Sequence, residues 1–331
     1  MQFQAVYYEP DVLSYPLGKQ LKQQYSTITW HPIQSHNAIP HMRRQPNAAF
    51  AGMKRNLIIG VRKTHRYTEN KKNSDYLVPY TSSGCTAMCL YCYLVCHYNK
   101  CAYLRLFVNR EQMLQKLCRF SQKTAKPAIY EIGSNSDLLL ENTITHNLEW
   151  TIPLFAQNGR GQITFPTKFD IVEPLLPLHH QGKTIFRMSV NPERIIRTIE
   201  LGTSPLFKRL AALQKMHDAG YPCGILIAPV IMLPDWEIQY EQLITQLADI
   251  LPSKLKSKLT VEVIFMTYSY IHRMINRDAF PAAPELYDPA LMSGRGPGKY
   301  YYHGEQRRRA ELFLSQQLAQ KMPESKLLYM C

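Results

Sequence analysis

Short apolar runs that alternate with amphipathic stretches constrain the fold of this chain more than any other feature. The apolar runs are residues 76–80, 128–132, 163–165, 185–190, 224–230 and 261–265. Amphipathic stretches that suit helices lie between them, at residues 110–120, 144–155, 205–219 and 236–251. Strands that alternate with helices favour a parallel sheet built of βαβ units. The pattern therefore predicts an α/β fold with an open or partial (β/α)6 barrel of the TIM type.

Cys85, Cys89 and Cys92 form a C-x3-C-x2-C motif directly after the first apolar run. Cysteine thiolates hold iron–sulfur clusters. Three thiolates at this spacing can bind three irons of a [4Fe–4S] cube and leave the fourth iron open. Radical S-adenosylmethionine (SAM) enzymes use this spacing and bind SAM at the open iron. Because active sites of parallel α/β folds lie at the carboxyl ends of the strands, the motif predicts a catalytic centre at that edge of the sheet.

Two further cysteines, Cys96 and Cys101, follow the motif closely and leave a second interpretation open. With Cys96 as a fourth ligand, the site would be a closed electron-transfer cluster or a structural zinc site. Zinc prefers four ligands in closed sites, usually as two C-x2-C pairs, and the sequence contains no second pair. The spacing favours the open cluster over both closed alternatives.

The composition is that of a globular enzyme, with 331 residues of which 45% are hydrophobic and 19% charged. The sequence contains no apolar stretch near the roughly 20 residues that a membrane span needs. Residues 1–10 lack the charged and apolar regions of a signal peptide. We therefore expect a cytoplasmic protein without a membrane partner. In that compartment cysteines are metal ligands or free thiols more often than disulfides.

The formal net charge of +14 is large for an enzyme of small metabolites. A basic surface concentrates polyanions and accelerates their capture. The basic residues gather in two segments, residues 54–72 ahead of the cysteine motif and residues 295–309 near the C-terminus. The second segment contains the run Tyr300-Tyr301-Tyr302, whose rings could stack on bases. Charge and aromatic residues together favour a nucleic-acid partner.

The same patterns divide the chain into three regions. Residues 1–74 carry few periodic patterns, and we expect an N-terminal extension that packs on the barrel and contains a short strand at residues 57–61. Residues 75–265 form the barrel. Residues 266–331 form a C-terminal segment with a hairpin and a helix, because the Pro- and Gly-rich stretch 281–298 carries turn signals and leaves the barrel. A monomer is favoured.

Ordered motifs along nearly the whole chain resemble those of the spore photoproduct lyase family, a group of radical SAM DNA-repair enzymes. The cysteine motif alone would indicate only the superfamily. The motifs that carry the resemblance are Tyr15-Pro-Leu-Gly, Gly60-Val-Arg-Lys-Thr, Cys89-Leu-Tyr-Cys-Tyr-Leu, Ser136-Asp137, Thr167-Lys168-Phe169, Gly182-Lys-Thr, Gly202-Thr-Ser-Pro, Ala228-Pro229 and Gly298-Lys-Tyr.

The resemblance implies a lyase that reverts spore photoproduct, 5-thyminyl-5,6-dihydrothymine, to two thymines. In that family a 5'-deoxyadenosyl radical abstracts a hydrogen atom from the lesion, the methylene bridge breaks, and a hydrogen atom returns to the product radical. The implied cofactors are a [4Fe–4S] cluster and SAM, in a barrel of the radical SAM kind. The implied partners are damaged double-stranded DNA and a reductant of the flavodoxin or ferredoxin type.

The resemblance also implies roles for individual residues. Cys85, Cys89 and Cys92 would ligate the cluster. Tyr91 and Tyr93 match tyrosines that the family uses near the hydrogen-return step. Positions near SAM or the lesion are Ser136, Asp137, Lys168, Ser189, Asn191 and Ala228, and DNA contacts are expected from Arg295, Lys299 and Tyr300.

The chain departs from the family at two positions. The family's hydrogen-donor cysteine is replaced by Ser134. A serine O–H bond is far stronger than a thiol S–H bond, so Ser134 is a poor hydrogen-atom donor, and Cys96, Cys101, Tyr91 and Tyr93 become the candidates. The family's Arg-Tyr wedge in the DNA-contacting hairpin is replaced by Gly294 and Arg295. Two alternative functions therefore stay open, a divergent radical SAM enzyme with another nucleic-acid substrate and a DNA-binding protein with a closed structural or redox cluster.

Overall fold

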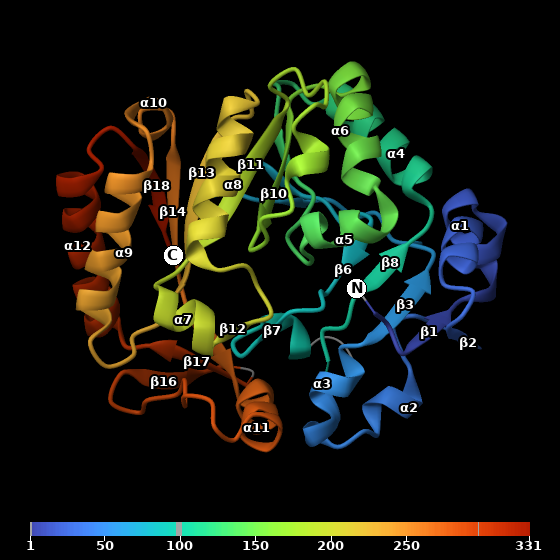
Figure 1. Cartoon of the computed structure of the whole chain (residues 1–331), viewed down its shortest axis with the longest axis horizontal. Coiled ribbons are helices and arrows are strands. Elements are labelled where there is room, and N and C mark those ends of the chain that lie inside the picture. The colour runs from blue at the N-terminus through green and yellow to red at the C-terminus, as the bar shows by residue number, and fades with distance from the viewer. Residues whose placement is uncertain (1, 97–100, 297) are drawn as a thin grey trace.

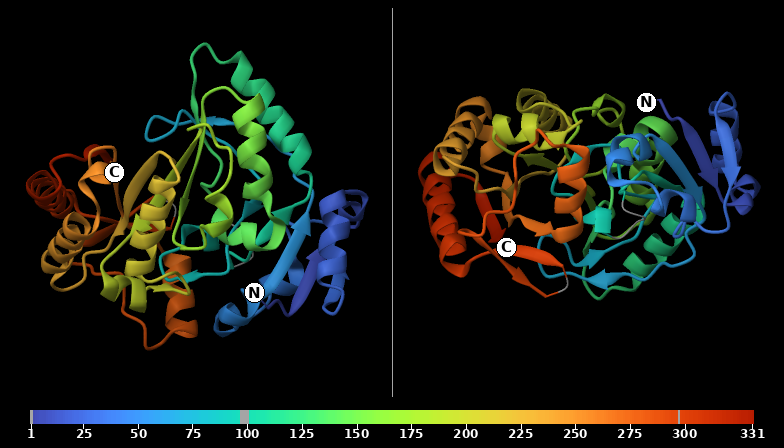
Figure 2. Two further views of the ribbon diagram at one scale, coloured as in Figure 1. Left: turned by 45° about the horizontal axis from the view of Figure 1, so that its top comes forward. Right: turned by 90° about the horizontal axis from the view of Figure 1, so that it is seen from below.

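The computed structural model describes residues 2–96, 101–296 and 298–331, and its largest element is an eight-stranded sheet. Every neighbouring pair of strands in this sheet is parallel except the outermost pair, β4 with β5. The sheet curls into a half-barrel (Figures 1 and 2). In spatial order its strands are β18 (Lys326–Met330), β14 (Thr260–Phe265), β13 (Cys223–Val230), β11 (Thr184–Val190), β10 (Gln162–Thr167), β9 (Ile129–Glu131), β5 (Tyr76–Leu77) and β4 (Thr68–Glu69).

All six strands predicted from the apolar runs are present in this sheet, which confirms the partial barrel. The sequence interpretation missed β18, because this short strand at the chain end lies beyond the last helix and pairs only with β14. The helices that cover the sheet are α4 (Arg110–Lys123), α5 (Leu138–Thr145), α6 (Asn147–Asn158), α7 (Glu193–Thr198), α8 (Leu206–Asp218), α9 (Trp236–Ile250), α10 (Ser253–Lys256) and α12 (Gly304–Lys321).

The prediction of a single helix at residues 144–155 is wrong, because α5 ends and α6 begins within this range. His146 has a left-handed φ of 53° and ends α5. The Asn142 side chain then accepts the backbone N–H of Leu148 at 2.8 Å, which satisfies a donor in the first turn of α6. The predicted helices at 110–120, 205–219 and 236–251 are confirmed as α4, α8 and α9.

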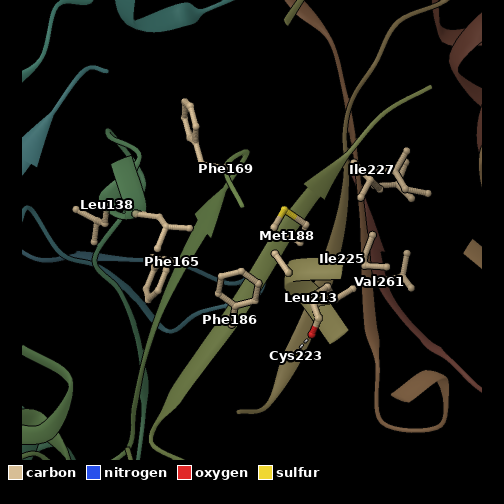
Figure 3. Close-up of a cluster of buried hydrophobic side chains, with 14 of the residues drawn as sticks. Leu138, Phe165, Phe169, Phe186, Met188, Leu213, Cys223, Ile225, Ile227 and Val261 are labelled. Carbon is tan, nitrogen blue, oxygen red and sulfur yellow. Dashed lines mark hydrogen bonds between the residues drawn. The ribbon is translucent and has the colours of Figure 1, made fainter. Parts of the chain in front are cut away.

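The two faces of the sheet have different chemistry, because successive side chains of a strand point to opposite faces. On β11, Phe186 and Met188 are buried in the apolar core with Leu213 of α8 (Figure 3). The alternate residue Arg187 lies 2.9 Å from a carboxylate oxygen of Glu131 and 3.1 Å from one of Glu262. This ion-pair group fills the inner face of the half-barrel, while the aromatic and aliphatic outer face is covered by helices.

A second sheet of five strands flanks the cysteine segment. Its order is β2 (Thr29–Pro32), β1 (Ala5–Tyr8), β3 (Asn56–Gly60), β8 (Arg105–Phe107) and β6 (Ser82–Ser83), and β3 confirms the strand predicted at residues 57–61. Because β6 precedes the cysteine motif and β8 follows it, the N-terminal strands hold both ends of that loop. Helices α1 (Pro16–Gln24), α2 (Pro40–Arg43) and α3 (Phe50–Met53) accompany this sheet.

The C-terminal region adds a three-stranded antiparallel sheet of β15 (Thr267–Ser269), β17 (Lys299–Tyr302) and β16 (Met292–Arg295). Strands β16 and β17 are the predicted hairpin, and α11 (Tyr270–Ala279) directly follows β15. The cysteine loop itself contributes β7 (Met88–Cys89), which pairs with β12 (Glu200–Leu201). Within the described part of the chain, no helix combines the length and apolar character needed to cross a membrane.

Candidate active site

A cavity of about 310 Å³ opens at the carboxyl ends of the barrel strands, where the cysteine loop was expected. The loop after β5, the turn after β9 and the ends of β10, β11 and β13 all contribute to its wall. The predicted site residues that line it are Cys85, Cys89, Tyr91, Cys92, Tyr93, Ser134, Ser136, Asp137, Lys168, Ser189 and Ala228. The structure therefore brings together the residues that the motifs singled out from widely separated parts of the chain.

Gly84 sets the course of the cysteine loop. Its φ is +73°, a left-handed conformation that favours glycine. A Cβ atom at this position would lie 2.1 Å from the backbone oxygen of Tyr103. The Gly84 N–H donates to the Asn135 carbonyl at 2.7 Å, and the Cys85 N–H donates to the Ala102 carbonyl at 3.1 Å. These contacts fix the backbone from which the first thiol projects into the cavity.

A buried lysine supports the same loop through hydrogen bonds to two backbone carbonyls. Lys54 is only 3% exposed, and its ammonium donates to the carbonyl oxygens of Cys85 at 2.6 Å and Ala102 at 2.7 Å. The sequence interpretation placed Lys54 in a basic surface segment for nucleic acid, which is wrong for this residue. Arg62 of the same segment donates to the Tyr80 carbonyl at 2.8 Å and lies over the Phe107 ring. Part of this basic segment therefore has a structural role.

Helix α11 also holds the loop, through two of its side chains. His272 Nδ1 lies 3.0 Å from the carbonyl oxygen of Cys92, and because a carbonyl only accepts, this nitrogen carries the proton. Asn276 donates from Nδ2 to the Leu90 carbonyl at 2.7 Å. Burial is the main reason that the pKa of His272 falls to about 3, so the ring is neutral. The C-terminal segment is thus attached directly to the cysteine loop.

The three motif thiols suit a cluster better than a single ion. All three are free cysteines that line one cavity. Burial raises the pKa of each thiol, for Cys92 to about 11, so the thiolates need the positive charge of bound iron. Among the described residues, no three His, Cys, Asp or Glu side chains converge on one metal ion. In a [4Fe–4S] cube each thiolate binds a different iron, so the three thiols need not meet at one ion.

Lys168 supplies a cation to the described part of the cavity wall. Its ammonium donates to Ser189 Oγ at 2.5 Å and to the Ala228 carbonyl at 2.7 Å, and it lies 2.9 Å from a carboxylate oxygen of Glu200. It also lies over the Tyr91 ring, 5.8 Å from the centroid. The ends of β10, β11 and β13 thus hold a positive charge next to the cysteine loop, with protein partners at Ser189, Ala228 and Glu200.

Glu200 joins the cysteine loop to this cation. The carboxylate is fully buried and accepts Tyr91 Oη at 2.6 Å and Asn191 Nδ2 at 2.9 Å. It also pairs with Arg209 at 2.7 Å. Burial by itself would raise the pKa of Glu200, but the charges of Lys168 and Arg209 outweigh it and lower the pKa to about 2. Since Glu200 pairs with Cys89 between β12 and β7, the network reaches the motif cysteines.

Ser136 and Asp137 have different roles in the wall. Asp137 caps α5 by accepting the Leu140 N–H, and it also accepts the Thr167 hydroxyl and the Lys168 N–H. Burial raises the pKa of its carboxyl. Ser136 Oγ lies 2.6 Å from Ser82 Oγ and donates to the Gly84 carbonyl at 2.9 Å. Both residues line the cavity, and both have hydrogen-bond partners within the protein, Asp137 on α5 and β10 and Ser136 on the cysteine loop.

The two tyrosines of the motif point to different parts of the site. The Tyr91 hydroxyl is held by Glu200, as described above. The Tyr93 hydroxyl donates to the Ser134 carbonyl at 2.8 Å and lies 3.0 Å from Asn135 Oδ1. Tyr93 is 44% exposed and lines the cavity. Its O–H group is therefore located at Ser134.

Three predicted site residues are not part of the described wall. Asn191 is buried behind it and bridges Glu200 and the Tyr240 hydroxyl. Cys101 is fully buried in an apolar cluster with Leu94 and Val95, and burial raises the pKa of its thiol to about 12. The backbone of Cys96 ends a short 3-10 helix, Tyr93–Cys96, but its side chain lies outside the described structure.

The residues predicted to contact DNA lie on the β16–β17 hairpin. Lys299 and Tyr300 begin β17 and are half-buried. The Tyr300 ring packs against Tyr270 at 4.1 Å and Tyr287 at 3.9 Å between centroids. Arg295 belongs to β16, but its side chain lies outside the described structure. The hairpin is therefore an aromatic cluster joined to α11.

Sequence reasoning missed Glu200, Lys54, His272 and Asn276, which hold the cysteine loop and its cation. One signal was available for Glu200, an acidic residue between Ile199 and Leu201 directly before the matched Gly202-Thr-Ser-Pro segment. Buried charges require partners, so a glutamate between apolar residues indicates a buried ion pair. Nothing in the sequence distinguishes Lys54 from its exposed basic neighbours.

Comparisons with known proteins agree with this geometry. The family model for spore photoproduct lyase matches residues 1–331. Spore photoproduct lyase of Bacillus subtilis (strain 168) is 32% identical over 339 residues, covering 98% of this chain and 97% of that protein. A solved spore photoproduct lyase complexed with dinucleoside spore photoproduct is 30% identical with a TM-score of 0.91, covering 99% of both chains. A mutant of such a lyase, solved with bound AdoMet and dinucleoside spore photoproduct, matches with the same identity and TM-score. The chain belongs to the spore photoproduct lyase family.

Proposed function

We propose that this protein is a radical SAM lyase that repairs spore photoproduct in DNA. One observation carries the proposal. A single cavity brings the three-cysteine loop together with Lys168 and Ser189, in a chain that aligns over its full length with spore photoproduct lyases. Bound in this cavity, a [4Fe–4S] cluster and SAM would supply the one-electron radical chemistry of the reaction.

The protein's own residues bind and orient these groups. Cys85, Cys89 and Cys92 would hold the cluster, and Lys168 would attract the SAM carboxylate with its positive charge at the cavity wall. Ser136 already donates its proton within the protein, so it would offer an oxygen lone pair to the SAM ammonium. Ser189 and the Ala228 carbonyl keep Lys168 in place. As in other cofactor enzymes, the protein positions the reactive atom and excludes competing reactions.

The return of a hydrogen atom needs a donor other than Ser134. Phenol O–H and thiol S–H bonds are of similar strength and much weaker than a serine O–H bond. Tyr93 is the candidate that the geometry favours, because its hydroxyl contacts Ser134 at the cavity wall. Tyr91 is held by Glu200, and Cys101 is buried outside the wall. Transfer from Tyr93 breaks its O–H bond, forms a C–H bond on the product radical and leaves a tyrosyl radical.

One electron and one proton restore Tyr93 after each turnover. The electron would come from the low-potential reductant of the flavodoxin or ferredoxin type that also serves the cluster. The proton would come from solvent, to which Tyr93 is 44% exposed. The substrate in the cell would be damaged duplex DNA, which the charge of +14 favours, and the protein would act in the cytosol.

The test is anaerobic turnover of dinucleoside spore photoproduct by reconstituted protein with SAM and dithionite, with chromatography of the products. We expect thymine dinucleoside as the product. Cleavage of SAM without this product would show a different nucleic-acid substrate, which is the alternative that Ser134 favours. If SAM does not change the spectrum of the cluster and is not cleaved, only the third alternative is left, a DNA-binding protein with a closed cluster.

A further inference from the structure

The surface of α11 that faces away from the cysteine loop is apolar and exposed. Tyr270 is 39% exposed, Ile271 48% and Met274 54%. Side chains three and four residues apart are neighbours on a helix surface, and Met274 follows Ile271 by three residues and Tyr270 by four, so the three side chains form one face. The opposite side of α11 is buried through His272, Ile275 and Asn276. We call Tyr270, Ile271 and Met274 the α11 face.

The attachment of α11 places this helix beside the active site. His272 and Asn276 bind carbonyls of the cysteine loop, and the cavity wall continues through Met266 and Thr267 to the strand before α11. The Tyr270 N–H donates to the Gly298 carbonyl at 3.0 Å, which fixes the start of α11 to the hairpin. Figure 1 shows α11 beside β17 on the same side of the molecule as β7 and β12.

Tyr270 occupies space that a side chain at position 294 would need. A Cβ atom on Gly294 would lie 2.2 Å from the Tyr270 hydroxyl oxygen. Tyr270 therefore fills the space beside Gly294, and α11 and the hairpin meet at this contact. Tyr300 packs against both Tyr270 and Tyr287, and Tyr270 is the ring of this cluster with a large exposed fraction.

Positive charges accompany the α11 face. The Arg273 and Arg277 side chains are 38% and 76% exposed, and Lys299 begins the adjacent strand. Acidic partners are close to both arginines, Glu285 at 3.0 Å from Arg273 and Asp278 at 3.6 Å from Arg277. An exposed apolar face with arginines around it, on a chain of charge +14, suits a polyanion that also offers stacked apolar surfaces.

We propose that the α11 face is a wedge that enters damaged duplex DNA beside the lesion and holds the strands apart. An enzyme that acts on a base must take it out of the stack, and unstacking costs energy. Proteins that unstack DNA commonly insert apolar side chains such as Leu, Ile or Met between base steps. Here Met274 and Ile271 would insert, Tyr270 would stack on a base, and Arg277 would contact phosphate. The inference rests on the proposed function, because it identifies how duplex DNA reaches that site.

The test compares two substrates for the variant Tyr270→Ala/Met274→Ala. Dinucleoside spore photoproduct has no stack to open, whereas a lesion in a duplex must be unstacked. We expect the variant to repair the duplex substrate about tenfold more slowly, which is the scale of one lost base–aromatic stack, and to repair the dinucleoside at the wild-type rate. Phe207→Ala is the matched control, because Phe207 is an apolar residue of α8 that is 64% exposed, and this control should match wild type on both substrates.

A second readout does not depend on turnover. A 2-aminopurine placed next to the lesion fluoresces more strongly when it is unstacked, so wild type should raise its fluorescence and the variant should not. If the variant lost the same fraction of its repair rate on both substrates, or none on either, the wedge proposal would be overturned. Wild-type protein that unstacks the probe but repairs neither substrate would overturn the proposed function and leave the wedge supported.

Discussion

Glu200 shows how one buried side chain can organise a candidate active site without lining the cavity itself. It accepts a hydrogen bond from Tyr91, pairs with Lys168 and Arg209, and lies on the strand that pairs with Cys89. Removal of one partner from a buried ion pair leaves an uncompensated charge, which is strongly destabilising. Glu200 therefore acts as a positioning residue for both the tyrosine and the lysine of the cavity.

Replacement of Glu200 by Gln should destabilise the protein by about 3 kcal/mol at pH 7. The pKa of Glu200 is lowered to about 2 from an ordinary value of 4.5, so its stabilisation is present above pH 4.5 and is lost as the pH falls toward 2. Urea unfolding of both proteins would measure this. The difference between wild type and Glu200→Gln should be constant near neutral pH and shrink below about pH 4.5. A difference that grew with acidity would contradict the assignment.

Tyr93 and Ser134 allow a test of the hydrogen donor by loss and rescue. Tyr93→Phe keeps the ring and removes the O–H group, so SAM should still be cleaved while thymine product falls by about a hundredfold or more, the lower end of what one catalytic proton-transfer group contributes. The double variant Tyr93→Phe/Ser134→Cys adds a thiol at the contacted position and should restore the product. Chromatography measures both. Product formation by Tyr93→Phe at the wild-type rate would exclude Tyr93 as the donor.

At the scale of elements, the cysteine loop is held by strands and helices from both ends of the chain. Gly84→Ala should prevent the loop from closing, because the new Cβ would meet the Tyr103 backbone oxygen at 2.1 Å. We expect a lower iron content after anaerobic reconstitution, measured per folded protein. Gly182→Ala is the matched control, since Gly182 has a similar φ of +67° but no atom within 4 Å of its added Cβ. Equal iron content in both variants would mean that the loop does not depend on this contact.

At the scale of the whole molecule, the net charge of +14 predicts strong dependence of DNA binding on salt. Each phosphate that the protein neutralises adds about −0.9 to the slope of log K against log salt concentration. Fluorescence anisotropy of an undamaged duplex should therefore show affinity that falls steeply with salt, and Arg277→Gln should reduce the slope by about one. Turnover of the dinucleoside should change little over the same range. Duplex affinity that is independent of salt would contradict a basic DNA surface.

Local patterns in the sequence predicted the parts of this molecule that depend on neighbouring residues. The six apolar runs became six strands of one sheet, and the cysteine loop lies at the carboxyl edge because it follows the first of them. The break at His146 and the strand β18 were missed, since the first depends on a single left-handed residue and the second on pairing with β14. Periodicity reports which face of an element is buried, but not where one element gives way to the next.

The sequence by itself determined the half-barrel, the position of the three cysteines and the resemblance to one lyase family. Only the tertiary structure decided which side chains hold that loop. Glu200, Lys54 and His272 meet the cysteine segment from three distant parts of the chain, and Tyr93 reaches Ser134 across the cavity. Such contacts arise because folding brings together elements that no local pattern connects, and a buried charge or hydroxyl is stable only where that packing supplies its partner.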